Sequence, residues 1–279
     1  MDAGNGTNGE HHRARGGCAA VRTLGLAAAL AASASAGAVN LIFDASPAPI
    51  NTAQVADTSF WVGVNLPSVI ASIVAPGSVT VNAGGHSAAL GVNAGSFGNG
   101  LTVSGIGAAL TVAESIHVGY GGATNALAIE TGAGASCGSF YMGSQSGATG
   151  NTFDLRSQAT LLTSGDVGIG NATGAGTNAA TVAASGTVWT VTGNTYVGYA
   201  SGGNTLTISS GGKVAADTLD VLIGAEPGAD GNRIRVTGTG STLSNLSGAP
   251  LHTLYVGRSG NSNTLEILAG GQVASGNVR

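Results

Sequence analysis

Short runs in which every second residue is apolar recur along the chain from about residue 60 onward. The clearest of these runs are 126–129, 152–155, 205–208, 233–236 and 264–267. Such alternation is typical of a half-buried β-strand. Beyond the run the chain often turns on paired glycines, as at 211–212 and 270–271, before a third apolar stretch. Glycine adopts positive φ angles at little cost. Each unit is therefore predicted to hold about three short strands joined by tight turns.

An apolar residue followed by glycine opens each unit and sets the period of the chain. The spacings between successive repeat glycines are 28, 28, 24, 25, 30, 26 and 33 residues. The repeat glycines are Gly63, Gly91, Gly119, Gly143, Gly168, Gly198, Gly224 and Gly257. Units of this length in a fixed order indicate a solenoid. Glycine and β-branched residues interrupt every window long enough for a helix, which favours strands.

These patterns predict an all-β chain that folds as a parallel β-helix, or β-solenoid. About eight coils of 24–33 residues, each with about three short strands, would stack about 4.8 Å apart into a rod of roughly 35–40 Å. We expect the variation in coil length to fall in one protruding loop, for example in 170–177 and 244–252.

An asparagine follows the repeat glycine in most units. It comes after six residues at Asn125, Asn204 and Asn263, after eight at Asn99, Asn151 and Asn232, and after ten at Asn178. Stacked side-chain amides can hydrogen-bond along a rod, and asparagine tolerates the left-handed turn conformation. We predict a structural column at one turn made of Asn125, Asn151, Asn178, Asn204, Asn232 and Asn263.

The first 38 residues have the pattern of a secretory signal peptide. Arg13, Arg15 and Arg22 precede an apolar run at 24–32, and Ala34-Ser35-Ala36 matches a small-x-small cleavage site. The run is shorter than the roughly twenty residues of a membrane span. We therefore expect a signal peptide at 1–38, a cap of the solenoid at 39–60, and β-helix repeats at 61–279 that are truncated at the C-terminus. The protein is predicted to be secreted or displayed at the cell surface, with no membrane span in this chain.

The composition excludes a nucleic-acid partner and fits a stacked fold. Of 279 residues, 49 are glycine and only 8% are charged, and the net charge is -4. No Lys or Arg occurs between Thr23 and Leu155, so no basic face is available for phosphate. Like charges at the same position of neighbouring coils would repel one another, and stacking therefore explains why charges are few.

Candidate chemistry is sparse. Glycoside hydrolysis needs two carboxylates on one face, whereas the carboxylates here mostly stand alone in sequence. His86, His117 and His252 belong to separate units without metal-ligand spacing. Cys137 has no basic neighbour in sequence and is expected to be a small buried residue. We expect no catalytic residue, no cofactor and no metal, and hence no enzyme.

Residues 196–273 contain close to two full copies of one repeat. The segment 196–214 reads Tyr-Val-Gly-Tyr-Ala-Ser-Gly-Gly-Asn-Thr-Leu-Thr-Ile-Ser-Ser-Gly-Gly-Lys-Val. The segment 254–273 reads Leu-Tyr-Val-Gly-Arg-Ser-Gly-Asn-Ser-Asn-Thr-Leu-Glu-Ile-Leu-Ala-Gly-Gly-Gln-Val, and a second flavour of unit lies between them at 222–243. This pattern resembles the repeat shared by type V secretion (autotransporter) passengers and PEP-CTERM proteins. The resemblance implies an exported, surface-displayed β-helical stalk or adhesin-like passenger, and it implies no catalytic residues.

Two functions follow as hypotheses. The first is a non-catalytic passenger or stalk that acts as a structural or adhesion module at the cell surface or outer membrane. The alternative is a β-helix that binds or cleaves polysaccharide. In either case we expect a monomeric rod whose candidate partners are glycans or proteins of a host or matrix. Candidate contact residues are Trp61, Trp189, Tyr120, Tyr199 and Tyr255, with the tyrosines of the Val-Gly-Tyr sequences expected to stack from coil to coil.

Overall fold

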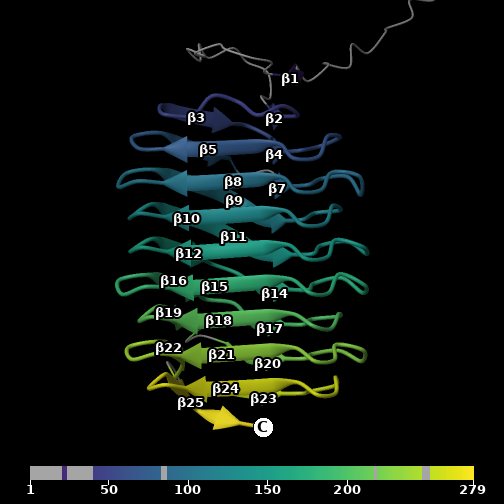
Figure 1. Cartoon of the computed structure of the whole chain (residues 1–279), viewed down its shortest axis with the longest axis vertical. Coiled ribbons are helices and arrows are strands. Elements are labelled where there is room, and N and C mark those ends of the chain that lie inside the picture. Colours follow the sequence, from purple (N-terminus) through teal and green to yellow (C-terminus); the bar gives the residue numbers. More distant parts are fainter. Residues whose placement is uncertain (1–20, 24–39, 83–86, 217–218, 247–251) are drawn as a thin grey trace, which may run out of the picture.

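The computed structural model describes residues 21–23, 40–82, 87–216, 219–246 and 252–279. In this part of the chain all regular elements are β-strands, which stack in parallel into a β-solenoid of about eight turns (Figure 1). The predicted fold class and its three strands per turn are therefore confirmed. Within these same ranges no helix is long and apolar enough to cross a membrane.

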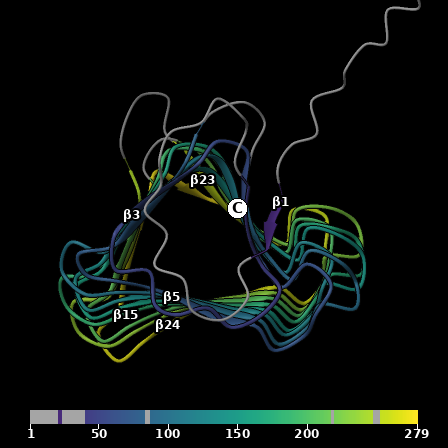
Figure 2. The ribbon, with the colours of Figure 1, turned by 90° about the horizontal axis from the view of Figure 1, so that it is seen from above.

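Each complete turn gives one strand to each of three columns, which form the three sides of a triangle when the rod is viewed along its axis (Figure 2); the first turn reaches the second column only through the isolated bridge between Ile50 and Ile73. The first column contains β2 (Asn40–Phe43), β4 (Ser59–Val62), β7 (Ala88–Leu90), the second halves of β9 (Ala109–Val118) and β11 (Gly134–Met142), β14 (Val167–Ile169), β17 (Thr195–Val197), β20 (Val221–Ile223), β23 (Thr253–Val256) and β26 (Asn277–Val278). The second column contains β5 (Ile70–Val74), β8 (Gly100–Ser104), β10 (Ala126–Glu130), β12 (Thr152–Arg156), β15 (Ala179–Ala183), β18 (Thr205–Ser209), β21 (Arg233–Thr237) and β24 (Thr264–Leu268). The third column contains β3 (Ala53–Ala56), β6 (Ser78–Val81), the first halves of β9 and β11, β13 (Thr160–Thr163), β16 (Val188–Val191), β19 (Lys213–Ala215), β22 (Thr242–Asn245) and β25 (Gln272–Ser275).

The stack begins earlier than the sequence repeats suggest. Strands β2 and β3 pair in parallel register with β4 and β6 of the next turn. Most of the segment predicted as a cap therefore already forms part of the solenoid. The short strand β1 (Val21–Thr23), which lies within the predicted signal peptide, pairs in parallel with β2. Residues 1–20 and 24–39 lie outside the described residues.

The alternating runs found in the sequence are the strands of the second column. In β12 and β18 the apolar residues of the alternation point inward and are buried, while their neighbours face solvent. The same register continues from turn to turn, so that Leu127 pairs with Phe153 and Phe153 with Ala180. Inward residues of the three columns therefore meet in one continuous core.

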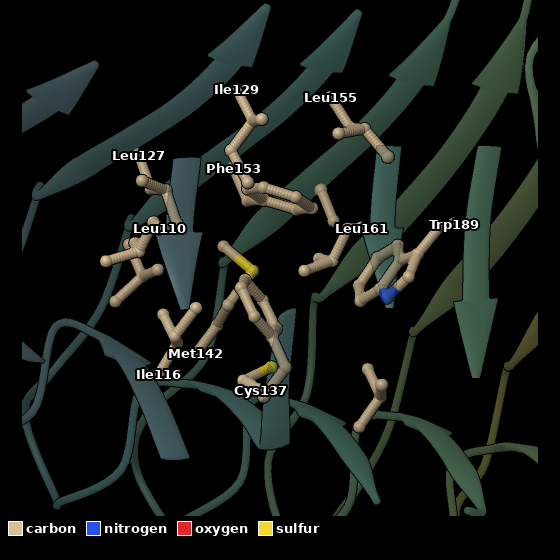
Figure 3. Packing of buried hydrophobic residues seen from close by; sticks show 14 of the residues in the cluster. Leu110, Ile116, Leu127, Ile129, Cys137, Met142, Phe153, Leu155, Leu161 and Trp189 are labelled. Atoms are coloured by element: carbon tan, nitrogen blue, oxygen red, sulfur yellow. The ribbon is translucent and has the colours of Figure 1, made fainter. Parts of the chain in front are cut away.

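Aromatic rings fill the middle of this core (Figure 3). The Phe140 and Phe153 ring centroids lie 4.7 Å apart, and each lies 5.2 Å from that of Trp189. The Trp189 Nε1–H donates to Thr163 Oγ1 at 3.1 Å, which satisfies its one polar group. Trp189 is only 1% exposed. The prediction that it is an exposed contact residue was wrong, because it occupies an inward position of β16.

Coil length varies mainly at two corners, so the prediction of one variable loop was also wrong; the third corner, between the second and third columns, takes three or four residues. The loops from the first to the second column span 63–69, 119–125, 198–204 and 257–263, or the longer 91–99, 143–151, 170–178 and 224–232. The connections from the third to the first column range from Gly138 alone, inside β11, to 246–252, of which 247–251 is outside the described residues. Strands that follow short and long loops keep the same register, so insertions at these corners leave the strand pairing unchanged.

Candidate functional site

The predicted asparagines stack in one column at the corner between the first and second strand columns. In each described step, the backbone N–H and the side-chain Nδ2 of one asparagine both donate to Oδ1 of the asparagine in the next turn, at 2.8–3.2 Å. The column contains Asn99, Asn125, Asn151, Asn178, Asn204, Asn232 and Asn263. It therefore includes Asn99, which was not among the six residues predicted. All members except Asn263 are at most 1% exposed.

The glycines at the start of these turns pack directly against the amides of the asparagine column. Gly198 has φ of +79°, and a Cβ placed on it would lie 2.1 Å from Nδ2 of Asn232 in the next turn. The same close approach to an asparagine amide is found at Gly63, Gly91, Gly119, Gly143, Gly170 and Gly224. Glycine is thus required twice at this position, for its left-handed backbone and for the space that the amide fills.

Gly168 is not one of these glycines, so its assignment as a repeat glycine was wrong. It lies inside β14 and pairs with Tyr196, whereas Ile169 pairs with Val197. The residue equivalent to Gly198 is therefore Gly170, which has φ of +73° and faces Asn204. The sequence contains two consecutive apolar-Gly pairs, Val167-Gly168 and Ile169-Gly170, and the strand register shows that the second is the repeat pair. Of the other predicted repeat glycines, Gly257 also has a positive φ, but it faces Gly260 rather than an asparagine of a further turn.

The outward face of the first strand column carries a series of half-buried aromatic side chains. Its central position, directly before the apolar-Gly pair, holds Trp61, Ala89, His117, Tyr141, Gly168, Tyr196, Leu222 and Tyr255 in successive turns. We call the five ring-bearing residues Trp61, His117, Tyr141, Tyr196 and Tyr255 the aromatic row. The remaining tyrosines, Tyr120 and Tyr199, follow the turn glycine beside this row and are 36% and 37% exposed. All five tyrosines of the chain and one of its two tryptophans therefore lie along one face.

A polar row runs parallel to the aromatic row. Two residues before each central position, and hence on the same face of the strand, stand Ser59, Ser87, Ser115, Ser139, Asp166, Asn194, Asp220 and Thr253. Part of this row is held by hydrogen bonds: Asp166 Oδ1 accepts from the Asn194 N–H at 2.8 Å, and Asp220 Oδ1 accepts from the Thr253 N–H at 2.8 Å. The face thus pairs apolar ring surfaces with hydroxyl groups and with amide and carboxylate groups that hydrogen bonds hold in place.

The rings form two local clusters. In one, the His117 ring lies 5.1 Å from that of Tyr120 and 5.5 Å from that of Tyr141, and His117 Nδ1 is 2.7 Å from Ser144 Oγ. In the other, the Tyr196 and Tyr199 rings lie 5.0 Å apart at a steep angle. Gly168 separates the two clusters, and a Cβ there would lie 3.0 Å from Cδ1 of the Tyr141 ring.

This packing corrects the expected role of the tyrosines. Tyr120 packs against His117 and Tyr199 against Tyr196, each within its own turn, so these two tyrosines do not stack on one another from coil to coil. Sequence reasoning also missed Tyr141 and Tyr196 as contact residues. The signal was present, because both directly precede an apolar-Gly pair of the repeat, as Trp61 and Tyr255 do.

Charged groups gather around Tyr196. Burial raises the pKa of Tyr196, and the carboxylate of Asp166 raises it further, so its hydroxyl keeps its proton at neutral pH. Asp220 and Arg258 also lie close enough to act on this hydroxyl. With two carboxylates and one guanidinium, the surroundings of Tyr196 carry a net negative charge.

Burial among its aromatic neighbours lowers the pKa of His117 to about 4 from the ordinary value of 6.5. Because the unfolded chain binds a proton more readily than the folded chain between these values, we expect stability to fall as the pH decreases from 6.5 to 4, by about 3 kcal/mol in total. Urea unfolding of the parent and of His117→Gln at several pH values measures this contribution. The variant should lose this part of the pH dependence; an identical pH dependence in both proteins would contradict the assignment.

The other titratable candidates are not gathered into a site. Cys137 is buried, and burial raises the pKa of its thiol to about 11, which leaves it protonated. His117 and His252 lie in different turns, and His86 is outside the described residues. Within the described ranges, no three His, Cys, Asp or Glu side chains are grouped so that they could hold a metal ion.

Comparisons with protein-family models, with curated proteins and with solved structures found no match to this chain.

Proposed function

We propose that this protein is an exported, non-catalytic β-helical rod that acts as a structural or adhesion module at the cell surface, in the manner of an autotransporter passenger. The observation that carries the proposal is the unbroken stacking of eight second-column strands beside one buried asparagine column. Such repetition builds an extended, regular surface from neighbour contacts alone. The signal-peptide pattern at 1–38 and the repeat resemblance at 196–273 support export and display.

Export is tested by expressing the full chain in a Gram-negative host and determining the N-terminal residue of the product outside the cytoplasm. We expect cleavage after Ala36 or Ala38, so that the product begins at Gly37 or Val39. A matched chain that lacks residues 1–38 should remain in the cytoplasm. A full-length product that begins at Met1 and stays in the cytoplasm would contradict export.

Adhesion is tested with beads that carry the purified rod covalently. Their retention under flow on glycan-coated and protein-coated surfaces is compared with that of albumin-coated beads. We expect selective retention on at least one surface. Retention no greater than that of albumin on every surface would contradict an adhesion module and leave a structural stalk.

A second candidate function, polysaccharide binding, is favoured by the aromatic row and its parallel polar row. Rings offer apolar faces and polar rims in one rigid side chain, a combination suited to ligands that have both kinds of surface. Cleavage would require a general acid and a base or nucleophile at a defined separation. Here one oxygen each of Asp166 and Asp220 is already engaged by a backbone N–H. We therefore propose binding without cleavage, and release of reducing ends from a bound polysaccharide would contradict this part.

A further inference from the structure

We infer that the aromatic row binds an extended, neutral β-1,4-linked glycan that lies parallel to the rod axis. This inference rests on the second candidate function, polysaccharide binding, and names the ligand and its orientation. It is carried by the position, spacing and charge of the residues on the first strand column.

The rings line one face of the rod along its axis, with buried residues between some of them, since Ala89 and Leu222 are 3% and 2% exposed. The central residues of this face occupy the same place in successive turns, so the rings follow the rod axis rather than encircle it. On the second and third strand columns, the outward positions of the described residues hold no aromatic side chain. A ligand that recognises these rings must therefore be long in one direction.

The spacing of the three tyrosines of the row selects the glycan; His117 lies one turn before Tyr141 and Trp61 three turns before it, outside this period. Tyr141, Tyr196 and Tyr255 recur at every second turn, and Gly168 and Leu222 occupy the turns between them. Adjacent turns are about 4.8 Å apart, so successive tyrosines are separated by roughly 10 Å along the axis. In an extended β-1,4-linked glycan, alternate sugar units present the same face, and this two-unit repeat is close to two strand spacings. α-1,4-Linked chains coil and do not keep this period.

The charge of the face selects a neutral ligand. Asp166 and Asp220 flank the row near Tyr196, with Arg258 as the opposing charge. Fixed carboxylates would repel an anionic polysaccharide, whereas they accept hydrogen bonds from sugar hydroxyls. The Asn194 side chain lies between the two aspartates: its Nδ2 donates to Asp166 Oδ1 at 3.5 Å and its Oδ1 accepts the Asp220 N–H at 3.2 Å, which fixes the two aspartates relative to each other.

The first experiment measures binding of the purified full chain to hydroxyethylcellulose by affinity electrophoresis and to cellohexaose by calorimetry. Maltohexaose and polygalacturonate serve as α-linked and anionic comparisons. Tyr196→Ala and Tyr255→Ala should each weaken β-glucan binding roughly tenfold, because each removes a ring face. Tyr196→Phe should bind nearly as the parent does, and Thr207→Ala on the second strand column is the matched control that should not change binding. Circular dichroism and thermal unfolding show whether each variant is folded.

A second variant tests the two-turn period itself. Tyr196→Leu combined with Leu222→Tyr keeps the composition and shifts one ring by a single turn, from a half-buried position to one where Leu222 is 2% exposed. We expect this pair, once shown to be folded, to lose binding as far as Tyr196→Ala does. Parent-like binding by this pair would overturn the two-turn period, and parent-like binding by both alanine variants would overturn the site. Equal binding of maltohexaose and cellohexaose would overturn the β-1,4 assignment and leave polysaccharide binding standing, whereas no binding to any glycan would overturn both.

Discussion

Replacing Asn125 by alanine should lower the free energy of unfolding by about 3–5 kcal/mol. Asn125 Oδ1 accepts both the backbone N–H and the Nδ2 of Asn99, at 3.0 and 2.9 Å, and both donors are buried. The substitution therefore leaves two donors without a partner where water cannot replace it. Urea unfolding followed by far-ultraviolet circular dichroism measures the loss.

The matched control for this variant is Asn93→Ala. Asn93 belongs to the loop 91–99 and donates its Nδ2 to Asn65 Oδ1 at 2.9 Å, but it is exposed. We expect its replacement to change stability by less than about 0.5 kcal/mol. A loss at Asn125 no larger than the loss at Asn93 would mean that the column contributes little to the stability of the rod.

Replacing Gly198 by alanine should destabilise the protein by about 4–5 kcal/mol. The left-handed backbone at φ of +79° costs an L-residue about 1–2 kcal/mol. The new Cβ would also displace the Asn232 amide, whose Oδ1 accepts two hydrogen bonds from Asn204 at 2.9 Å. Gly228→Ala is the matched control, because Gly228 has φ of +84° and a Cβ there would meet nothing within 4 Å. Gly228→Ala should lower the free energy of unfolding only by the backbone strain, about 1–2 kcal/mol.

The combination with Asn232→Ala separates strain from displacement. With the amide removed, Gly198→Ala should add only about 1–2 kcal/mol to the loss caused by Asn232→Ala alone. The measurement is a double-mutant cycle on urea midpoints. Strictly additive losses would show that the glycine and the asparagine act independently, contrary to their 2.1 Å approach.

Much of this architecture can be predicted from the sequence because each turn of a solenoid repeats the same pattern of apolar, glycine and asparagine residues. The alternating runs predict the second strand column, and the asparagine spacing predicts the column of amides. Asn178 is an example: the spacing predicted its place in the column, but it left open from which glycine the residues should be counted. Its count of ten from Gly168 was the one irregular spacing, and counting from Gly170 gives eight, as at Asn99, Asn151 and Asn232.

Strand register and side-chain direction explain the wrong prediction for Trp189 and the omission of Tyr141 and Tyr196 from the predicted contact residues. Trp189 lies in Val188–Val191, where the adjacent apolar residues Val188 and Trp189 interrupt the alternation. The sequence alone therefore did not show which set of residues faces the core, and a shift by one residue reverses every side chain. Tyr141 and Tyr196 were missed although each directly precedes an apolar-Gly pair in the sequence, as Trp61 and Tyr255 do, and the strand pairing aligns all four. The polar row has no sequence signature of its own, since serine, asparagine and aspartate also occupy the loops.

All the hydrogen bonds between asparagine side chains of the column run in the same direction, from each turn to the next, so the two ends of the rod differ chemically. Each amide points its N–H groups toward the next turn, so the side-chain dipoles add, with the positive end at the last turn. At the other end, Val69 donates its backbone N–H to Asn99 but brings no side-chain acceptor of its own. At the last turn, Asn263 Nδ2 is buried and has no hydrogen-bond partner among the described residues. A further turn with an asparagine at this corner, stacked on the Asn263 end, would accept a hydrogen bond from Asn263 Nδ2. A further turn stacked on the Val69 end would find no side-chain acceptor there. Addition of turns is therefore favoured at the Asn263 end.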